Sequence, residues 1–348
     1  MAYNKTYRNA AWLTAQARNS YNQLTAAMPL GRWFPFKANP NLNYEFDLVT
    51  TNPGTYAEFR DFDAENAKGK QFAGATAYGR LVPIGKDYRV TEYEAMYRRG
   101  GLEATQAIQM KLDDLAVLGG KDIARRLELA RLDALLTGSV SLQHGTGEPG
   151  GRINWNRDPS LSVVKASGQR WTVDTVDPIA DIIAWRELVR AQSGVLPVYL
   201  LAGGDVIAAL RRNKIIRDYF YAGMASVGNL VTIPGLEAVL SQEAGIQGII
   251  NMDDAYALNA DIGLVNPWPR GTIALVAGPS QSFGATEFTE TAFSTDSQFG
   301  ISGSQRYGIL GHAFDQDNVF GLWVGINATA LPTMPGFNQV LTAQVIAG

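Results

Sequence analysis

Residues 60–90, RDFDAENAKGKQFAGATAYGRLVPIGKDYRV, limit the folds open to this chain more than any other stretch. Lys68, Lys70, Arg80 and Lys86 stand among small residues and glycines in this stretch. Few large apolar side chains lie between Phe72 and Leu81. Alternating residues before this part and IGKDYRVTEY after it predict two strands of a long hairpin. A hairpin with so little to bury is not stable alone. We therefore predict an arm, over residues 51–97, that reaches onto a neighbouring molecule.

The charged side chains of this arm carry both signs, which suits pairing with opposite charges on an adjacent subunit. The residues expected to make such contacts are Asp61, Asp63, Glu65, Lys68, Lys70 and Arg80. The alternative is a mobile surface loop.

A second segment, GRWFPFKANPNLNYEF, is rich in aromatic residues and interrupted by prolines, so it is expected to run extended. Such a segment cannot bury three neighbouring aromatic side chains by itself, and aromatic side chains are common interface anchors. We expect Trp33, Phe34 and Phe36 to pack on a neighbouring subunit. On this interpretation, removing residues 1–36 leaves the chain folded.

The composition narrows the class of protein. The 348 residues are 18% charged, below the usual ~25%, which suggests a surface partly covered by other subunits. The net charge of −3 disfavours a protein whose main work is binding phosphates. No run reaches the ~18 apolar residues of a membrane span, and the N-terminus lacks the apolar region of a secretory signal. With no cysteine there is no thiolate chemistry, and a cytoplasmic product is expected.

The remaining elements predict a mixed α+β fold. Helical periodicity covers residues 8–27 and, most strongly, 101–137, where Gly119 and Gly120 are expected to break or bend the helix. Residues 176–285 have the pattern of a compact α/β block, with a helix that Asp177 caps and Gly194 ends. Asp205 is expected to cap the helix that follows the strand PVYLLA. The last sixty residues are β-rich.

The candidates for enzymatic chemistry are weak. His144 and His312 are the only histidines, and no G-x-S-x-G elbow accompanies them. Gly145–Gly150 matches G-x-G-x-x-G but contains a proline and opens no helix, and Gly203-Gly204 follows a strand but lacks the third glycine. Two stretches that superficially resemble calcium loops lack ligands at required positions. We predict no catalytic, cofactor or metal site, and we interpret the protein as structural.

The order of parts resembles that of the lambda-type major capsid proteins of tailed phages, which have the Hong Kong 97 capsid fold. The stretches that carry the resemblance are KDIARRLELARLDALLTGSVSL, TVDPIADIIAWRELV, VYLLAGGDVIAALRRNKIIRDYF and FDQDNVFGLWVGINATALPTMPGFNQVLTAQV. PLGRWFPF stands where the family has an arm segment rich in proline and phenylalanine.

The resemblance implies four parts. Residues 1–50 would form an N-terminal arm and 51–97 an extended hairpin, the E-loop. Residues 98–175 with 286–348 would form the peripheral domain, and 176–285 the axial domain around the capsomer axis. The start of the chain has no coiled-coil pattern, so a scaffolding segment is expected to be absent or encoded separately.

The function implied is that of a head protein. Copies would assemble into hexamers and pentamers of an icosahedral shell around double-stranded DNA, in the host cytoplasm and then as part of the virion. Partners would be scaffolding, portal and possibly decoration proteins, with DNA held without sequence specificity. Two alternatives stay open, namely an encapsulin-like compartment shell and a hydrolase or nucleotide-binding enzyme built on 176–285.

Overall fold

The computed structural model describes residues 2–3, 7–48, 75–97, 104–142, 151–222, 230–257, 262–263, 266–280, 283–315 and 321–347. Its helices are α1 (Ala10–Ala27), α2 (Glu92–Tyr97), α3 (Ala104–Thr137), α4 (Pro178–Ser193), α5 (Gly204–Arg212), α6 (Lys214–Phe220), α7 (Ile233–Ala244) and α8 (Met252–Ala257). Its strands are β1 (Ala2–Tyr3), β2 (Phe36–Ala38), β3 (Asn43–Leu48), β4 (Ala75–Arg80), β5 (Val82–Val90), β6 (Ser139–Ser141), β7 (Arg152–Asn154), β8 (Ser162–Val164), β9 (Tyr199–Ala202), β10 (Gly248–Asn251), β11 (Thr272–Val276), β12 (Ala285–Thr289), β13 (Leu310–Asp315), β14 (Leu322–Thr333) and β15 (Val340–Gln344).

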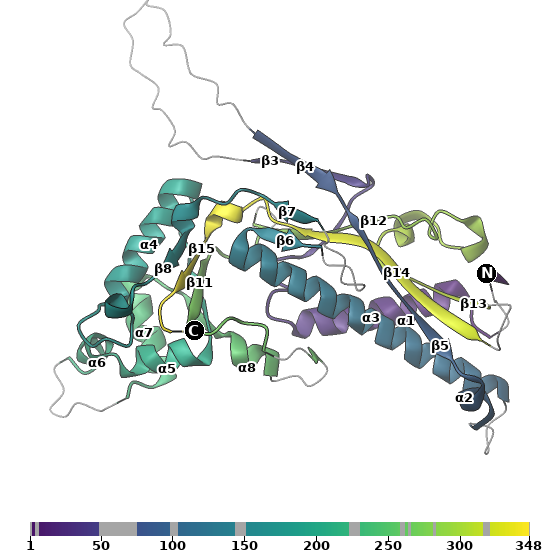
Figure 1. The fold of residues 1–348 in the computed structure, drawn as a ribbon, viewed down its shortest axis with the longest axis horizontal. Helices are drawn as coiled ribbons and strands as arrows, with labels where there is room; N and C mark the ends of the chain where they lie inside the picture. The colour runs from purple at the N-terminus through teal and green to yellow at the C-terminus, as the bar shows by residue number, and fades with distance from the viewer. Residues whose placement is uncertain are drawn as a thin grey trace, which may run out of the picture.

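The first sheet has the order β1-β13-β14-β12-β2, with β5 also paired to β14. The long helix α3 runs beside it with α1 (Figure 1). Leu13 of α1, Leu112 of α3 and Ile326 of β14 are all buried in one apolar core between these elements. The α+β class expected from the sequence is confirmed.

Helix α3 is continuous over its 34 residues, so the break expected at Gly119-Gly120 is wrong. A Cβ at Gly119 would lie 2.4 Å from Ile326 Cγ1, and one at Gly120 would lie 2.2 Å from the Ala17 carbonyl oxygen. The glycines therefore allow α1 and β14 to approach the helix closely. Close packing explains why glycine stands at both positions, and the bend expected there stays a prediction.

The hairpin arm begins earlier than the sequence suggested. Strand β3 starts at Asn43 and pairs antiparallel with β4, ahead of the expected start at residue 51. The pair projects from the body of the molecule (Figure 1). Strand β5, expected to belong to the hairpin, instead pairs with β14 along nine residues. Residues 49–74, which include the first part of the stretch 60–90, lie outside the described residues.

The second sheet has the order β10-β9-β11-β15-β8 and its own apolar core, to which α4, α5 and α7 contribute. Strands β8 and β15 lie in this sheet, although the expected boundaries placed residues 98–175 and 286–348 in the other domain. The sheet is mixed, because β15 pairs antiparallel with β11 and parallel with β8. The α/β block therefore recruits strands from before and after it in the chain.

Candidate subunit interface

Helix α4 carries apolar or small side chains on two faces. Asp177 caps its N-terminus, Pro178 stands in the first turn and Gly194 ends it in the left-handed conformation, as expected. One face buries Ile179, Ile182, Trp185 and Val189 in the second core. The opposite face leaves Ala180, Ile183, Ala184 and Ala191 exposed at helical spacing. Glu187 and Arg190 interrupt this exposed side, so it is a mixed surface of apolar, small and charged side chains.

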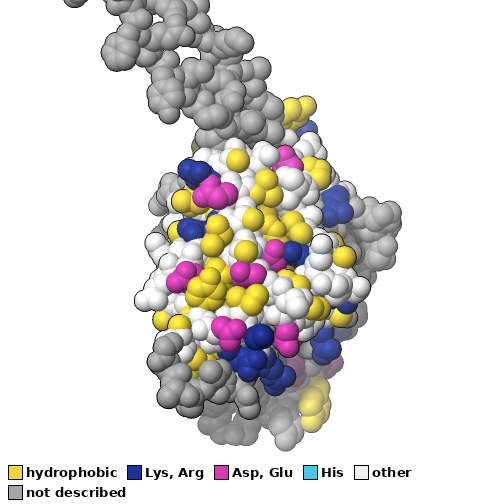
Figure 2. Space-filling model, turned by 90° about the vertical axis from the view of Figure 1, so that its left-hand side faces the viewer, with side chains coloured by type: hydrophobic (Ala, Val, Ile, Leu, Met, Phe, Trp, Pro, Cys, Tyr) yellow, Lys and Arg dark blue, Asp and Glu magenta, His cyan; other side chains and the backbone are white. Residues whose placement is uncertain are grey.

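Helix α4 lies at the left-hand end of the molecule in Figure 1. Figure 2 looks onto this end and shows hydrophobic side chains gathered across the middle of the face, with charged groups around and among them. Ile183 on α4, and Val195 and Leu196 just after its end, are large apolar side chains that are exposed. We call the exposed side of α4, together with these two residues, the α4 face.

Two ion pairs lie next to the exposed apolar side chains of α4. Lys165 Nζ lies 2.6 Å from Asp181 Oδ1 and also stands over the Trp185 ring, which ties the end of β8 to α4. Glu187 and Arg190 form an exposed pair on α4 itself. Strand β8 is an edge of its sheet, and Val164 at its end is 75% exposed. An apolar centre with polar groups at the rim is the usual anatomy of an interface.

Two of the three aromatic residues predicted to contact a neighbour are buried in the chain's own core, so that prediction is wrong for them. Trp33 is fully buried and donates from Nε1 to the Ala277 carbonyl at 3.0 Å. Phe34 is buried against Phe283. The segment is extended only at Phe36–Ala38 and Asn43–Leu48, whereas residues 31–34 form turns closed by hydrogen bonds to the Leu30 carbonyl. Partners distant in sequence supply the pockets for Trp33 and Phe34. Phe36 is 55% exposed on β2, so for this residue the contact stays a prediction.

The structure describes one of the six charged residues that were predicted to make contacts on the arm. Arg80 is exposed at the end of β4, opposite Asn43 of β3. The other five, Asp61, Asp63, Glu65, Lys68 and Lys70, lie outside the described residues. The contacts expected of all six remain predictions.

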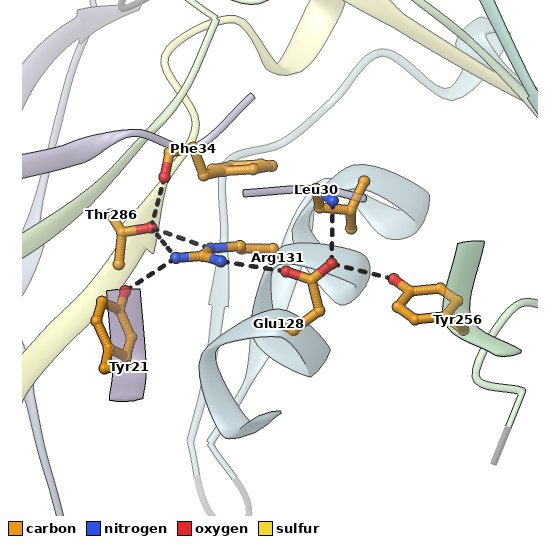
Figure 3. A network of polar contacts seen from close by, with 7 residues as sticks. All are labelled: Tyr21, Leu30, Phe34, Glu128, Arg131, Tyr256 and Thr286. Carbon is orange, nitrogen blue, oxygen red and sulfur yellow. Dashed lines mark hydrogen bonds and ion pairs between the residues drawn. The ribbon is translucent and has the colours of Figure 1, made fainter. Parts of the chain in front are cut away.

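A buried polar network joins the elements behind these surfaces (Figure 3). Arg131 and Glu128 of α3 form an ion pair at 3.1 Å, with 1% and 0% of their side chains exposed. Arg131 also donates to Thr286 of β12 and Tyr21 of α1, while Glu128 accepts from the Leu30 amide and the Tyr256 hydroxyl. Burial and the neighbouring Glu128 charge raise the pKa of Tyr256, so its hydroxyl stays a donor. The network was not predicted, because its members are up to 265 residues apart in sequence.

The weak chemical candidates have structural explanations. His312 is buried between Phe293, Phe299 and Phe314, and burial lowers its pKa to about 4. His144 and Gly145–Gly150 lie outside the described residues. Among the residues that are described, no cluster of three or more metal-ligating side chains occurs, and no helix is both long and apolar enough to span a bilayer.

At the turn between β9 and α5, backbone amides donate to carboxylates of the chain itself. Gly203 is the N-cap of α5, so the expectation that Asp205 caps this helix is wrong. Asp205 instead accepts from the Gly271 amide, and Asp253 Oδ2 accepts from the Gly204 amide at 2.7 Å. A carboxylate thus stands at the helix N-terminus where a phosphate would otherwise bind. This supports the interpretation as an ordinary strand–helix turn.

Comparisons with known proteins place the fold. No family model matches the chain, and no curated protein matches it either. Among solved structures, the chain is similar to a phage-related protein from Bordetella bronchiseptica RB50, with a TM-score of 0.55 and 14% identity over 99% of this chain and 98% of that one. It is also similar to the putative capsid protein of a prophage from Escherichia coli CFT073, with a TM-score of 0.57 and 13% identity over 97% and 99%.

These likenesses span essentially the whole of each chain at low identity, which establishes the fold. The chain has the mixed α+β architecture of the Hong Kong 97 capsid fold, as the resemblance of its sequence implied. That expectation is confirmed.

Proposed function

We propose that this chain is the major capsid protein of a tailed double-stranded DNA phage, and that it assembles into the hexamers and pentamers of an icosahedral head. The observation that carries the proposal is the full-length match in fold to a prophage protein described as a putative capsid protein. Its role would be structural, with binding energy supplied by burial of surface between copies.

The α4 face supports this role. Its apolar side chains belong to a well-packed domain, so their exposure is not explained by a poor core. Monomeric proteins rarely leave a large contiguous apolar patch uncovered. Copies arranged around a symmetry axis would each present this face to the next copy, and a ring closes when the rotation between copies divides a full turn.

The parts of the chain take the corresponding roles. The second sheet with its helices would be the axial domain, and the first sheet with α3 the peripheral domain. The β3–β4 pair would be the root of the E-loop. Partners would be scaffolding, portal and possibly decoration proteins, with the packaged DNA bound without sequence specificity. The protein would reside in the virion after assembly in the host cytoplasm.

Electron microscopy of the purified, expressed chain tests the proposal, alone and with the products of neighbouring genes. Closed shells with five-fold and six-fold capsomers are expected. Shells that enclose a co-expressed enzyme instead of DNA would indicate the encapsulin-like alternative. A monomer that never assembles under either condition, and that binds a nucleotide or turns over an ester, would overturn the proposal in favour of an enzyme.

A further inference from the structure

A groove lies where α1 ends and the chain crosses towards β2. It has a volume of about 530 Å³, and its lining includes Met28, Arg32, Phe34, Phe36, Ile250 and Ala255. We call it the Arg32 groove. Its walls are mostly apolar, and the Phe36 ring stacks on Phe288 at 5.1 Å and is 55% exposed. The groove therefore offers a surface on which an aromatic side chain could be buried.

Arg32 gives the groove a positive charge that no carboxylate of the described residues neutralises. Its guanidinium lies 4.0 Å from the centre of the Trp33 ring and 5.7 Å from that of Tyr199, and the side chain is exposed. Within the described part of the chain, no carboxylate pairs with it. The Trp33 ring and, at its side, the Tyr199 ring hold the guanidinium group near the groove, and a pre-positioned arginine suits two-point binding of a carboxylate.

The backbone beside the groove is also open. Strand β2 ends its sheet, with β12 as its only neighbour in the described sheet, and all three of its residues are exposed. Edge strands in native proteins are usually covered or paired. An extended segment could add to this edge while its side chains enter the groove, which is a common mode of peptide recognition.

We propose that the Arg32 groove binds the segment 59–65, FRDFDAE, of a second copy of this chain. In this segment a phenylalanine, Phe62, stands between two aspartates, Asp61 and Asp63, and the seven residues carry a net charge of −2. That chemistry complements an apolar groove beside an exposed arginine. The inference rests on the proposed assembly and names the basic partner of the arm's acidic residues.

The direction of the arm favours a second copy over the chain's own segment. Strands β3 and β4, which precede and follow residues 49–74, project away from the body (Figure 1). Aromatic residues and arginine are the types most often found to dominate interface energies. The proposed contact would bring together Arg32 and Phe36 of one copy with residues 61–63 of the other. These residues would then contribute most of the binding energy of the contact.

Cross-linking between two tagged chains tests the contact, because the protein has no cysteine of its own. One chain carries Ala27→Cys, at an exposed residue of the groove lining, and the other carries Ala64→Cys, so both phenylalanines and the two aspartates are kept. A short bis-maleimide reports proximity as a heterodimer on a denaturing gel. The matched control replaces Ala27→Cys by Tyr93→Cys, on an exposed side chain of α2 outside the groove. We expect at least tenfold more heterodimer from the groove pair than from the control.

Charge reversal separates binding from mere proximity. Arg32→Glu should lower the heterodimer yield at least tenfold, and Arg212→Glu, on an exposed arginine of α5, should not. Shells that form normally with equal cross-linking at groove and control overturn the inference and leave the proposed function standing. If no shells form, the proposed function fails, and cross-linking between soluble copies then tests the contact. A heterodimer between soluble copies supports binding of segment 59–65 in the Arg32 groove. The absence of that heterodimer overturns the inference.

Discussion

At the scale of single residues, the ion pair Glu128–Arg131 depends closely on the polar groups that surround it. Both charges are removed from water, so each depends on the other and on the hydroxyl and amide groups around them. The network joins α1, α3, α8, β12 and the segment before β2. A buried pair of this kind is a poor source of net stability, but losing one partner is costly.

We predict that Arg131→Met lowers the free energy of unfolding by about 3–5 kcal/mol, because Glu128 would be left as an unpaired buried charge. Arg190→Met is the matched control, since Arg190 and Glu187 have the same spacing on an exposed helix face. Its expected cost is about 0–1 kcal/mol. Urea denaturation of both variants measures the difference, and equal costs would contradict the prediction.

His312 should make the stability of the chain depend on pH. Burial lowers its folded pKa to about 4, whereas an unfolded histidine titrates near ~6.5. Between these values the unfolded chain binds more protons, so stability falls as the pH decreases from about 6.5 to about 4. Asp87 borders the same gap at Gly325, and burial raises the pKa of its carboxyl, so its protonation favours the folded chain and partly offsets the effect of His312 at the acid end.

The expected loss is roughly 3 kcal/mol across that window, measured by denaturation at pH 7 and pH 4.5. His312→Phe should flatten this part of the profile, because a phenyl ring fits among Phe293, Phe299 and Phe314 without titrating. His144 is retained in both proteins, so its contribution cancels. An unchanged profile in the variant would show that another group is responsible.

At the scale of elements, α3 depends on its two glycines for contact rather than for flexibility. We predict that Gly120→Ala destabilises the chain by about 1–3 kcal/mol, since the new methyl group meets the Ala17 carbonyl of α1 and cannot be accommodated by a rotamer change. The gain in helix propensity, ~1 kcal/mol, is smaller than this steric cost.

The control for an added methyl group is Gly168→Ala, where nothing lies within 4 Å of the new Cβ. Thermal unfolding monitored by circular dichroism compares the two variants. A higher melting temperature for Gly120→Ala would mean that α1 can shift away, and that the close packing is not required.

Elements whose signals are local were predictable from the sequence, and those defined by distant partners were not. Asp177, Pro178 and Gly194 fix the ends of α4 within the helix itself, and the structure places them as expected. Trp33 was misplaced because its pocket comes from Ala277 and Tyr199, which no local pattern reveals. The same packing removes the reason to expect a folded chain without residues 1–36, since α1 and Trp33 are part of the core.

The candidate interface was visible in the sequence only in part. Ile182 and Ile183 are adjacent in the sequence and equally apolar, yet Ile182 is buried in the core and Ile183 is 42% exposed. Apolar residues occupy more of the circumference of α4 than one buried face requires, which indicates a second covered face. Periodicity alone does not show which apolar residue belongs to which face. The Arg32 groove left no sequence signal, because it forms between α1, β2 and the start of α8.

At the scale of the whole molecule, the α4 face should govern assembly without governing folding. We predict that Ile183→Lys leaves the unfolding free energy within about 0.5 kcal/mol of the parent, because the side chain is on the surface. Shell formation should be lost, since a charge would enter the apolar centre of the contact between copies. Light scattering and electron microscopy measure assembly.

Tyr93→Lys, an equally drastic change at a 70% exposed side chain of α2, is the control and should assemble normally. Normal shells from Ile183→Lys would show that the α4 face is not the contact between copies. A loss of folding in that variant would show instead that Ile183 belongs to the core.

The join between β4 and β5 has a mechanical consequence. Only Leu81 separates the projecting pair from the strand that crosses the first sheet, and Leu81 is buried and donates its amide to the Leu42 carbonyl. Tension applied at the arm therefore runs along β5, parallel to its nine-residue ladder with β14. Such a pull shears many hydrogen bonds at once, whereas a pull across the strand would open them one by one. The arm is thus anchored to the body through a pair of strands that is loaded in shear.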